Sequence, residues 1–274
     1  WLAAHGVPES AIAAELLAAR LLGTGRGFLA PHLASKPSPE DLAAMRSALV
    51  RLRSGEPVQY VLGEWDFRRL TLKCDRRALI PRPETEGLVS LVLASKTAKN
   101  APKPFIVDVC TGSGCIALAI ADELPSAIVL GIDISPDAVA LATENASALP
   151  PHASRRVRFA VSDGLDGFDD PQSIDIIVSN PPYIPSADIL TLDPRIRNWE
   201  PRIALDGGPA GLDFYERFVA DAIHLLKPGG EIFFEIGSEQ APAMRELLES
   251  SGFAAVSITP DLAGLPRYAS ASLP

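Results

Sequence analysis

From residue 105 onward, short apolar runs alternate with stretches of helical periodicity, and this alternation constrains the fold more than any other feature of the chain. The expected strands are residues 105–109, 127–132, 157–161, 174–178, 231–236, 253–258 and 268–272, the last two of which could close a sheet. The expected helices are residues 115–123, 136–148 and 212–226. Strands that alternate with helices are typical of an open α/β fold. We therefore predict an α/β domain built on a mainly parallel, seven-stranded sheet.

The chain before residue 105 differs in character and predicts two smaller parts. Residues 1–56 are rich in Ala and Leu, and their apolar residues recur at helical spacing between proline breaks. This pattern indicates short helices, one of which should begin after Ser38 with Pro39 at its first position. From residue 60 to residue 80, apolar and polar residues interleave, which indicates extended structure and a β-hairpin. We expect a helical domain over residues 1–56, a hairpin linker over 57–86 and the sheet domain over 87–274.

Composition excludes several classes of protein. The 274 residues are 47% hydrophobic and 22% charged, as in globular proteins. A net charge of −9 opposes stable binding of nucleic acid. No apolar run is long enough to span a membrane, and three scattered cysteines give neither a disulfide framework nor a metal site. We expect a cytoplasmic protein, or an organelle-matrix protein if a transit segment preceded Trp1.

A glycine-containing loop follows the first strand of the predicted sheet. Its residues are Cys110, Thr111, Gly112, Ser113 and Gly114. Glycines let the backbone turn sharply and approach a ligand closely. Asp133, at the end of the second strand, can accept hydrogen bonds from both hydroxyls of a ribose. Loop and carboxylate together predict a nucleoside pocket, although the same pattern also fits the dinucleotide site of a dehydrogenase.

Two residues after the third strand add to this edge of the predicted sheet. The carboxylate of Asp163 could accept a hydrogen bond from an adenine amino group, and Gly164 follows it directly. Asp and Gly are also common turn residues whatever the function of a protein. Both interpretations of this pair stay open.

The fourth strand is followed by Asn180, Pro181, Pro182 and Tyr183, a segment that we call the tetrad. The two prolines fix the backbone and remove two N–H donors, which leaves rigid acceptors. The Asn180 side-chain oxygen and the Pro181 carbonyl can each accept one N–H of a substrate NH₂ group. The nitrogen lone pair would then point toward a methyl donor while Tyr183 stacks on the planar group. The tetrad therefore predicts methylation of an amide or amino nitrogen.

Nearly the whole chain resembles the HemK/PrmC family of protein-(glutamine-N5) methyltransferases. The resemblance is carried by residues 55–63 (GEPVQYVLG), 65–67 (WDF), 80–86 (IPRPETE), the glycine loop, 180–185 (NPPYIP), 199–201 (WEP) and 204–205 (AL). It implies a Rossmann-like class I methyltransferase fold with a small N-terminal helical domain joined by a β-hairpin. It also implies methyl transfer from S-adenosylmethionine to the glutamine of the Gly-Gly-Gln motif in peptide-chain release factors.

By motif, the resemblance implies a role for each site residue. The donor would contact Cys110, Thr111, Gly112, Ser113, Gly114, Asp133, Gly164 and Asn180, with Asp163 added from its position in the sheet. The glutamine would contact Asn180, Pro181, Pro182, Tyr183 and Arg82, and the catalytic residues would be Asn180, Pro181 and Tyr183. The family usually has Gly at the Cys110 position and often an aromatic residue at the Gly164 position. The helical domain would recognise the body of the release factor, and we expect a monomer without a metal.

Three other functions remain open at the level of sequence. The tetrad is shared with adenine-N6 methyltransferases, which use it on a base flipped out of the nucleic acid. A dehydrogenase would use the glycine loop and Asp133 but would leave the tetrad idle. An adaptor that binds the donor without turnover would use the pocket alone.

Overall fold

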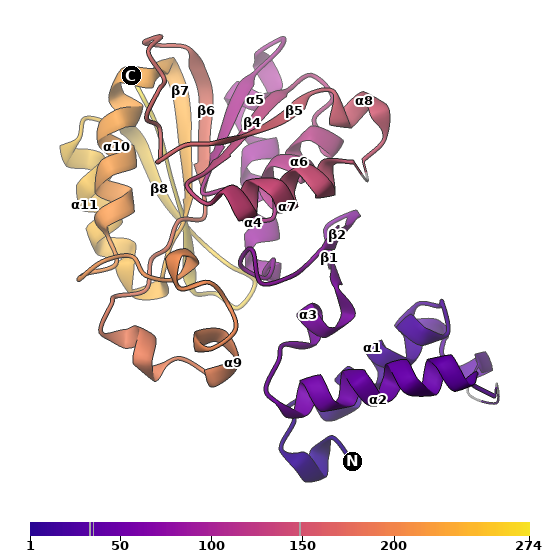
Figure 1. The fold of residues 1–274 in the computed structure, drawn as a ribbon. Helices are drawn as coiled ribbons and strands as arrows, with labels where there is room; N and C mark the ends of the chain where they lie inside the picture. The colour runs from indigo at the N-terminus through magenta and orange to yellow at the C-terminus, as the bar shows by residue number, and fades with distance from the viewer. Residues whose placement is uncertain (33, 35, 148) are drawn as a thin grey trace.

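The computed structural model describes residues 1–32, 34, 36–147 and 149–274. Figure 1 shows a sheet covered by helices on both faces and, apart from it, a small group of N-terminal helices. A short hairpin connects the two parts. This arrangement agrees with the fold class predicted from the sequence.

Three helices make up most of the N-terminal part: α1 (Ser10–Leu21), α2 (Pro39–Arg53) and α3 (Val58–Leu62). The predicted helix start at Ser38 is confirmed, because its hydroxyl accepts a hydrogen bond from the Asp41 backbone N–H. The Asp41 carboxylate in turn accepts one from the Ser38 backbone N–H, a reciprocal cap. The helices enclose a small core formed by Leu2, Ala13, Leu17 and Leu52.

The hairpin consists of β1 (Glu64–Phe67) and β2 (Leu70–Lys73), paired antiparallel. The prediction of extended structure from residue 60 onward is wrong for its first residues, which lie in α3. Helix α3 buries Tyr60, whose hydroxyl donates to the Ala78 carbonyl at 2.8 Å. Gly63 ends the helix with a φ of 77°, a left-handed conformation that glycine adopts without strain.

The sheet contains seven strands in the order β5-β4-β3-β6-β7-β9-β8. The strands are β3 (Phe105–Val109), β4 (Ile128–Asp133), β5 (Val157–Val161), β6 (Ile174–Ser179), β7 (Leu226–Glu235), β8 (Ala254–Pro260) and β9 (Pro266–Ser272). Strands β5, β4, β3, β6 and β7 are parallel, whereas β9 runs antiparallel to both of its neighbours. The mainly parallel sheet predicted from the sequence is confirmed.

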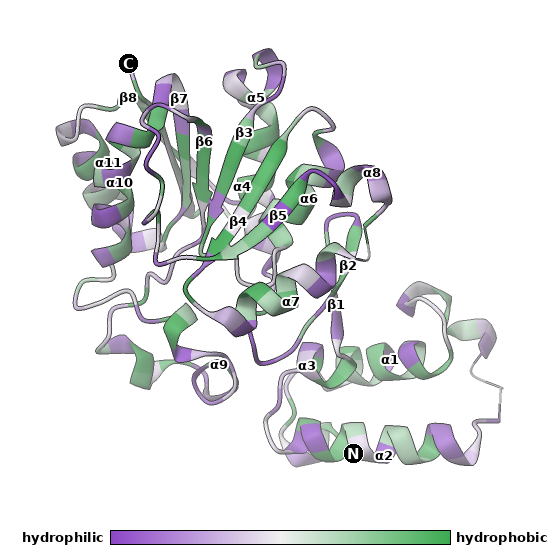
Figure 2. Ribbon diagram, turned by 45° about the horizontal axis from the view of Figure 1, so that its top comes forward, coloured by the Kyte–Doolittle hydropathy of each residue, from purple (hydrophilic) through white to green (hydrophobic). Residues whose placement is uncertain are grey.

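Helices cover both faces of the sheet (Figure 1). One face carries α4 (Pro83–Ala94), α6 (Cys115–Glu123) and α7 (Pro136–Ala146), and the other carries α10 (Asp213–Leu225) and α11 (Ala241–Ser250). In Figure 2 the central strands are strongly hydrophobic, which fits their burial between two helical layers.

Some predicted boundaries differ from those of the structure. The boundary expected between residues 86 and 87 falls inside α4, so the linker and the sheet domain share this helix. Ala148, the expected end of the second helix, lies outside the described residues. No helix in the described ranges is long and apolar enough to cross a membrane.

The strand order determines where a ligand can bind. From β3 the chain proceeds outward to β4 and β5 and then returns to place β6 on the other side of β3. In open α/β sheets such a reversal leaves a crevice at the carboxyl ends of the strands. The carboxyl ends of β3, β4 and β6 therefore meet at one edge of the sheet, where the glycine loop follows β3, Asp133 ends β4 and the tetrad follows β6.

Candidate active site

A pocket lies at this reversal of strand order, and we call it the strand-end pocket. Of the residues predicted for the site, those that line it are Arg82, Cys110, Thr111, Gly112, Ser113, Asp133, Asn180 and Pro182. Gly114, the last residue of the loop and the N-cap of α6, is not part of the lining. The structure thus brings together the loop after β3, the carboxylate at the end of β4 and two residues of the tetrad, Asn180 and Pro182.

The glycine loop turns sharply because three of its residues, Cys110 and the two glycines, have a left-handed backbone. Gly112 has a φ of 55° and Gly114 a φ of 82°. A Cβ atom on Gly114 would lie 3.0 Å from Phe159 Cζ and 3.1 Å from Ala142 Cβ. A side chain at this position would therefore push the loop out of place.

Cys110 is the loop residue that departs from the resembled family. Its φ of 60° lies in the left-handed region, which costs a non-glycine residue roughly 1–2 kcal/mol. Its side chain packs against the core on the α10 face, and burial raises the pKa of the thiol well above its usual value. The cysteine therefore lines the pocket as a strained, neutral thiol.

We expect Cys110→Gly to raise the free energy of unfolding by about 1 kcal/mol, because glycine adopts this backbone without strain. The unfolding midpoint should rise by a few degrees in thermal denaturation. Cys110→Ala is the matched control, since it removes the sulfur but keeps the strained Cβ, and it should not be stabilised. Equal midpoints for the two variants would show that the backbone strain is negligible.

Two carboxylates hold the loop in place. Asp133 Oδ2 accepts a hydrogen bond from the Gly112 N–H and Oδ1 accepts one from the Ser135 N–H, both at 2.9 Å. Each oxygen keeps a lone pair for a ligand hydroxyl. Asp108, fully buried beneath the loop, accepts from the Thr111 hydroxyl at 2.6 Å, and burial raises the pKa of this carboxyl to about 7. The loop is thus fixed before any ligand binds.

Asp163 and Gly164 do not line the strand-end pocket in this structure, and their contacts with the donor stay a prediction. The Asp163 carboxylate instead accepts a hydrogen bond from Arg217 Nη1 at 2.6 Å. A Cβ on Gly164 would lie 2.8 Å from Phe218 Cε1, and its φ of 59° also disfavours a side chain. A side chain at this position would therefore require Phe218 to move.

Ile134 and Phe214 are among the apolar residues of the pocket that sequence reasoning missed. Ile134 is 48% exposed although it is a large hydrophobic residue. It directly follows Asp133 at a strand end, and this position could have identified it. Phe214 belongs to the amphipathic helix α10 and carries no local signature, because its spacing is also that of a core residue.

The tetrad borders a second pocket, which we call the tetrad pocket. Pro181 and Tyr183 line it together with Glu235 at the end of β7. Four residues line both pockets: Leu79, Arg82, Asn180 and Ala204. The Asn180 side-chain nitrogen donates to the Thr85 hydroxyl at 3.2 Å. Asn180 therefore lies where the two pockets meet, and the hydrogen bond to Thr85 holds its side-chain amide in place.

Arg82 is tied to the loop that follows the tetrad. Its guanidinium donates to the Glu200 carboxylate, whose side chain is only 1% exposed. Glu200 also accepts a hydrogen bond from the Ile80 backbone N–H at 3.0 Å. Breaking a buried ion pair of this kind costs roughly 3–5 kcal/mol. The pair therefore fixes the linker against the walls of both pockets.

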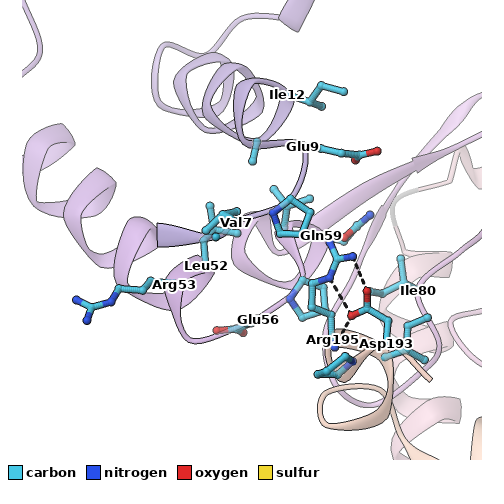
Figure 3. Close-up of a pocket in the computed structure, with 18 of the residues that line it drawn as sticks. Val7, Glu9, Ile12, Leu52, Arg53, Glu56, Gln59, Ile80, Asp193 and Arg195 are labelled. Atoms are coloured by element: carbon cyan, nitrogen blue, oxygen red, sulfur yellow. Dashed lines mark hydrogen bonds and ion pairs between the residues drawn. The ribbon is translucent and has the colours of Figure 1, made fainter. Parts of the chain in front are cut away.

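A larger cavity, of about 440 Å³, lies between the helical domain and the loop that contains α9 (Pro194–Arg197). Figure 3 shows Glu9, Ile12 and Gln59 on one side of this interdomain cavity, with Arg195 held by Asp193 on the other. Arg82 also lines it, so the interdomain cavity adjoins the tetrad pocket.

Comparison with known proteins supports both the fold and the family. A crystal structure of a methyltransferase from Pyrococcus furiosus matches 86% of this chain and 98% of its own, with a TM-score of 0.52 at 15% identity, which supports the fold alone. Residues 88–191 match the methyltransferase small domain family, and residues 1–63 match the PrmC N-terminal domain family.

Curated relatives extend over the whole chain. The release factor glutamine methyltransferase of Cereibacter sphaeroides is 39% identical and is matched over 100% of this chain and 95% of its own length. The enzymes of the same name from Geobacter sulfurreducens and Rhodospirillum rubrum are 39% and 41% identical, over 97% and 96% of this chain and 91% and 78% of their own lengths. Identity at this level over almost full length shows that the chain belongs to the release factor glutamine methyltransferase family.

Proposed function

We propose that this protein transfers a methyl group from S-adenosylmethionine to the side-chain amide nitrogen, N5, of the glutamine in the Gly-Gly-Gln motif of a peptide-chain release factor. The observation that carries the proposal is the position of Asn180 at the meeting point of the strand-end pocket and the tetrad pocket. Relatives with the same printed function span the chain, which supports this substrate.

The residues of the strand-end pocket fit this donor, which supplies a methyl group activated by a positively charged sulfur. Asp133 keeps acceptor lone pairs for two ribose hydroxyls while its carboxylate is held by two backbone N–H groups. Ile134 and Phe214 offer apolar surface for a flat heterocycle. The donor-binding residues that we propose are Cys110, Thr111, Gly112, Ser113, Gly114, Asp133, Ile134, Asn180 and Phe214.

The tetrad pocket suits a planar amide. An amide nitrogen is a poor nucleophile because its lone pair is delocalised into the carbonyl group. We propose that Asn180 Oδ1 and the Pro181 carbonyl each accept one N–H, which orients the lone pair and stabilises the positive charge that develops on nitrogen. Tyr183 then stacks on the amide plane, while Pro182 and Arg82 shape the entrance. After methyl transfer the nitrogen loses one proton and becomes a neutral secondary amide.

We propose the three units of the sequence division as functional units. Residues 1–56 recognise the body of the release factor, and residues 87–274 carry out the methyl transfer. Residues 57–86 connect these two units. The interdomain cavity beside the tetrad pocket supports this division, because a protein bound there would lie next to the reacting group.

We further propose a monomer that acts in the cytoplasm, or in an organelle matrix, without a stable nucleic-acid partner.

The proposal is tested by transfer of a labelled methyl group from S-adenosylmethionine to a release factor, to a Gly-Gly-Gln peptide and to duplex DNA. The release factor should be labelled fastest, and a release factor with that glutamine replaced by glutamate should stay unlabelled. Labelling of DNA alone would contradict the proposal and support adenine-N6 methylation, which the net charge of −9 disfavours.

A further inference from the structure

Two buried side chains form a hydrogen-bonded chain behind Asn180. Asn180 Nδ2 donates to Thr85 Oγ1 at 3.2 Å, and the Thr85 hydroxyl donates to Glu235 Oε2 at 2.7 Å. Thr85 comes from α4 and Glu235 from β7, and each is only 2% exposed. We call these three side chains the amide relay.

The relay has a direction, because a hydroxyl group carries only one proton. The Thr85 proton is used toward the carboxylate, which accepts hydrogen bonds but cannot donate them. Thr85 therefore offers Asn180 only a lone pair, and only the NH₂ end of the Asn180 amide can bind there. The other end, Oδ1, is left for the tetrad pocket. The two ends of an asparagine amide are almost identical in shape, so the relay decides which of them meets the substrate.

The charge of Glu235 is poised to change near neutral pH. Burial raises the pKa of its carboxyl to about 7, against the opposing effects of the Thr85 hydrogen bond and the positive charge of Arg267. Tyr215 approaches from α10 and donates to the Glu235 backbone carbonyl at 2.7 Å. The other charged or titratable groups within electrostatic reach of the carboxyl are Arg82, Glu84, Cys115, Tyr183 and Tyr268.

We propose that Glu235, acting through Thr85, is a positioning residue that keeps the Asn180 side-chain oxygen turned toward the substrate nitrogen, and that methyl transfer requires its carboxylate form. This inference rests on the proposed function. A protonated Glu235 can donate to Thr85, whose hydroxyl then donates to Asn180 and selects the oxygen end of the amide. The Asn180 NH₂ group would then face the NH₂ group of the substrate, and two donors cannot hydrogen bond to each other.

Because the active form is deprotonated, kcat should fall as the pH drops through about 7, the pKa of the Glu235 carboxyl, and should level off above it. Thr85→Val removes the relay while preserving shape, and kcat should decrease roughly 10-fold or more while the Kd for S-adenosylmethionine stays within about 2-fold. The acid limb of the pH profile should disappear. Thr85→Ser keeps the hydroxyl and should restore both kcat and the acid limb.

Glu235→Gln tests the charge itself. The variant is nearly isosteric, and we expect a lower kcat with a pH profile that is flat near neutrality. Glu231→Gln is the matched control, because Glu231 lies in the same strand and accepts only a peripheral hydrogen bond from the Thr97 N–H. This control should keep the wild-type profile. An unchanged acid limb in both Glu235→Gln and Thr85→Val would overturn the proposal.

A second measurement separates this inference from the proposed function, since it needs no methyl acceptor. The NMR signals of the Asn180 side-chain NH₂ group in the free protein should shift with a midpoint near pH 7. They should stay constant across the same range in Glu235→Gln. Signals that do not titrate in the wild type would refute the relay, whatever substrate the enzyme methylates. A clear midpoint without methylation of release factor would support the relay and reject the proposed substrate.

Discussion

Asn180→Ala should lower kcat for methyl transfer by about 100- to 1,000-fold, the loss typical when one preorganised polar group is removed from a reacting centre. The Kd for S-adenosylmethionine should change by no more than several-fold, because Asn180 contributes only one part of the strand-end pocket. Removing the side chain also leaves the Thr85 hydroxyl without its partner on this side. Single-turnover kinetics at saturating donor, together with calorimetric titration of the donor, would measure both effects.

Asn100→Ala is a suitable control for this experiment, because Asn100 is exposed at the end of α5 (Lys96–Asn100) and lines none of the pockets described above. It should behave like the wild type. A variant at residue 180 that bound the donor poorly but reached the wild-type rate at saturation would assign Asn180 to donor binding alone.

Asp133→Ala should raise the Kd for S-adenosylmethionine by about 10- to 100-fold, because hydrogen bonds to a charged group contribute roughly 1.5–3 kcal/mol each. The loss has two sources: the ribose hydroxyls lose their acceptor, and the Gly112 N–H loses the carboxylate that holds the loop. kcat at saturating donor should fall much less than in Asn180→Ala. Isothermal titration of the donor measures the effect directly.

Asp137→Ala, in the exposed first turn of α7, removes a nearby carboxylate without touching the loop. Its donor affinity should equal that of the wild type. The same affinity in both variants would mean that Asp133 does not contact the ribose.

The strands were predicted well where each is a buried apolar run, as for residues 105–109, which match β3 residue for residue. Prediction was poorer where tertiary contacts, and not the local sequence, determine where a strand or helix lies. Strand β7 begins at Leu226, ahead of a Pro-Gly-Gly segment typical of a turn, because Leu226 pairs with Ile174 beyond an irregularity in the ladder. Helix α11 was missed, since its buried residues are few, among them Met244 and Leu248.

The candidate site likewise contains a part that the sequence predicts and a part that it does not. The glycine loop and the tetrad are contiguous segments whose chemistry is visible in the sequence, and both lie where the predicted sheet places them. The amide relay is not contiguous: Asn180 is 95 residues from Thr85, and Thr85 is 150 residues from Glu235. Only the order of the strands, with β7 beside β6, brings these side chains together. No local pattern could have revealed them.

Arg82 borders the strand-end pocket, the tetrad pocket and the interdomain cavity, and its guanidinium is anchored by a carboxylate that solvent scarcely reaches. Because Arg82 lines all three, a substitution of Arg82 cannot change the shape of one of them alone. Under the proposed function, a change in the shape or charge of Arg82 would affect the bound donor, the glutamine amide and the docked release factor together. The proposed function therefore predicts that substitutions at the outer rim of the cavity change the preference for a release factor alone, whereas substitutions of Arg82 change protein recognition and catalysis together.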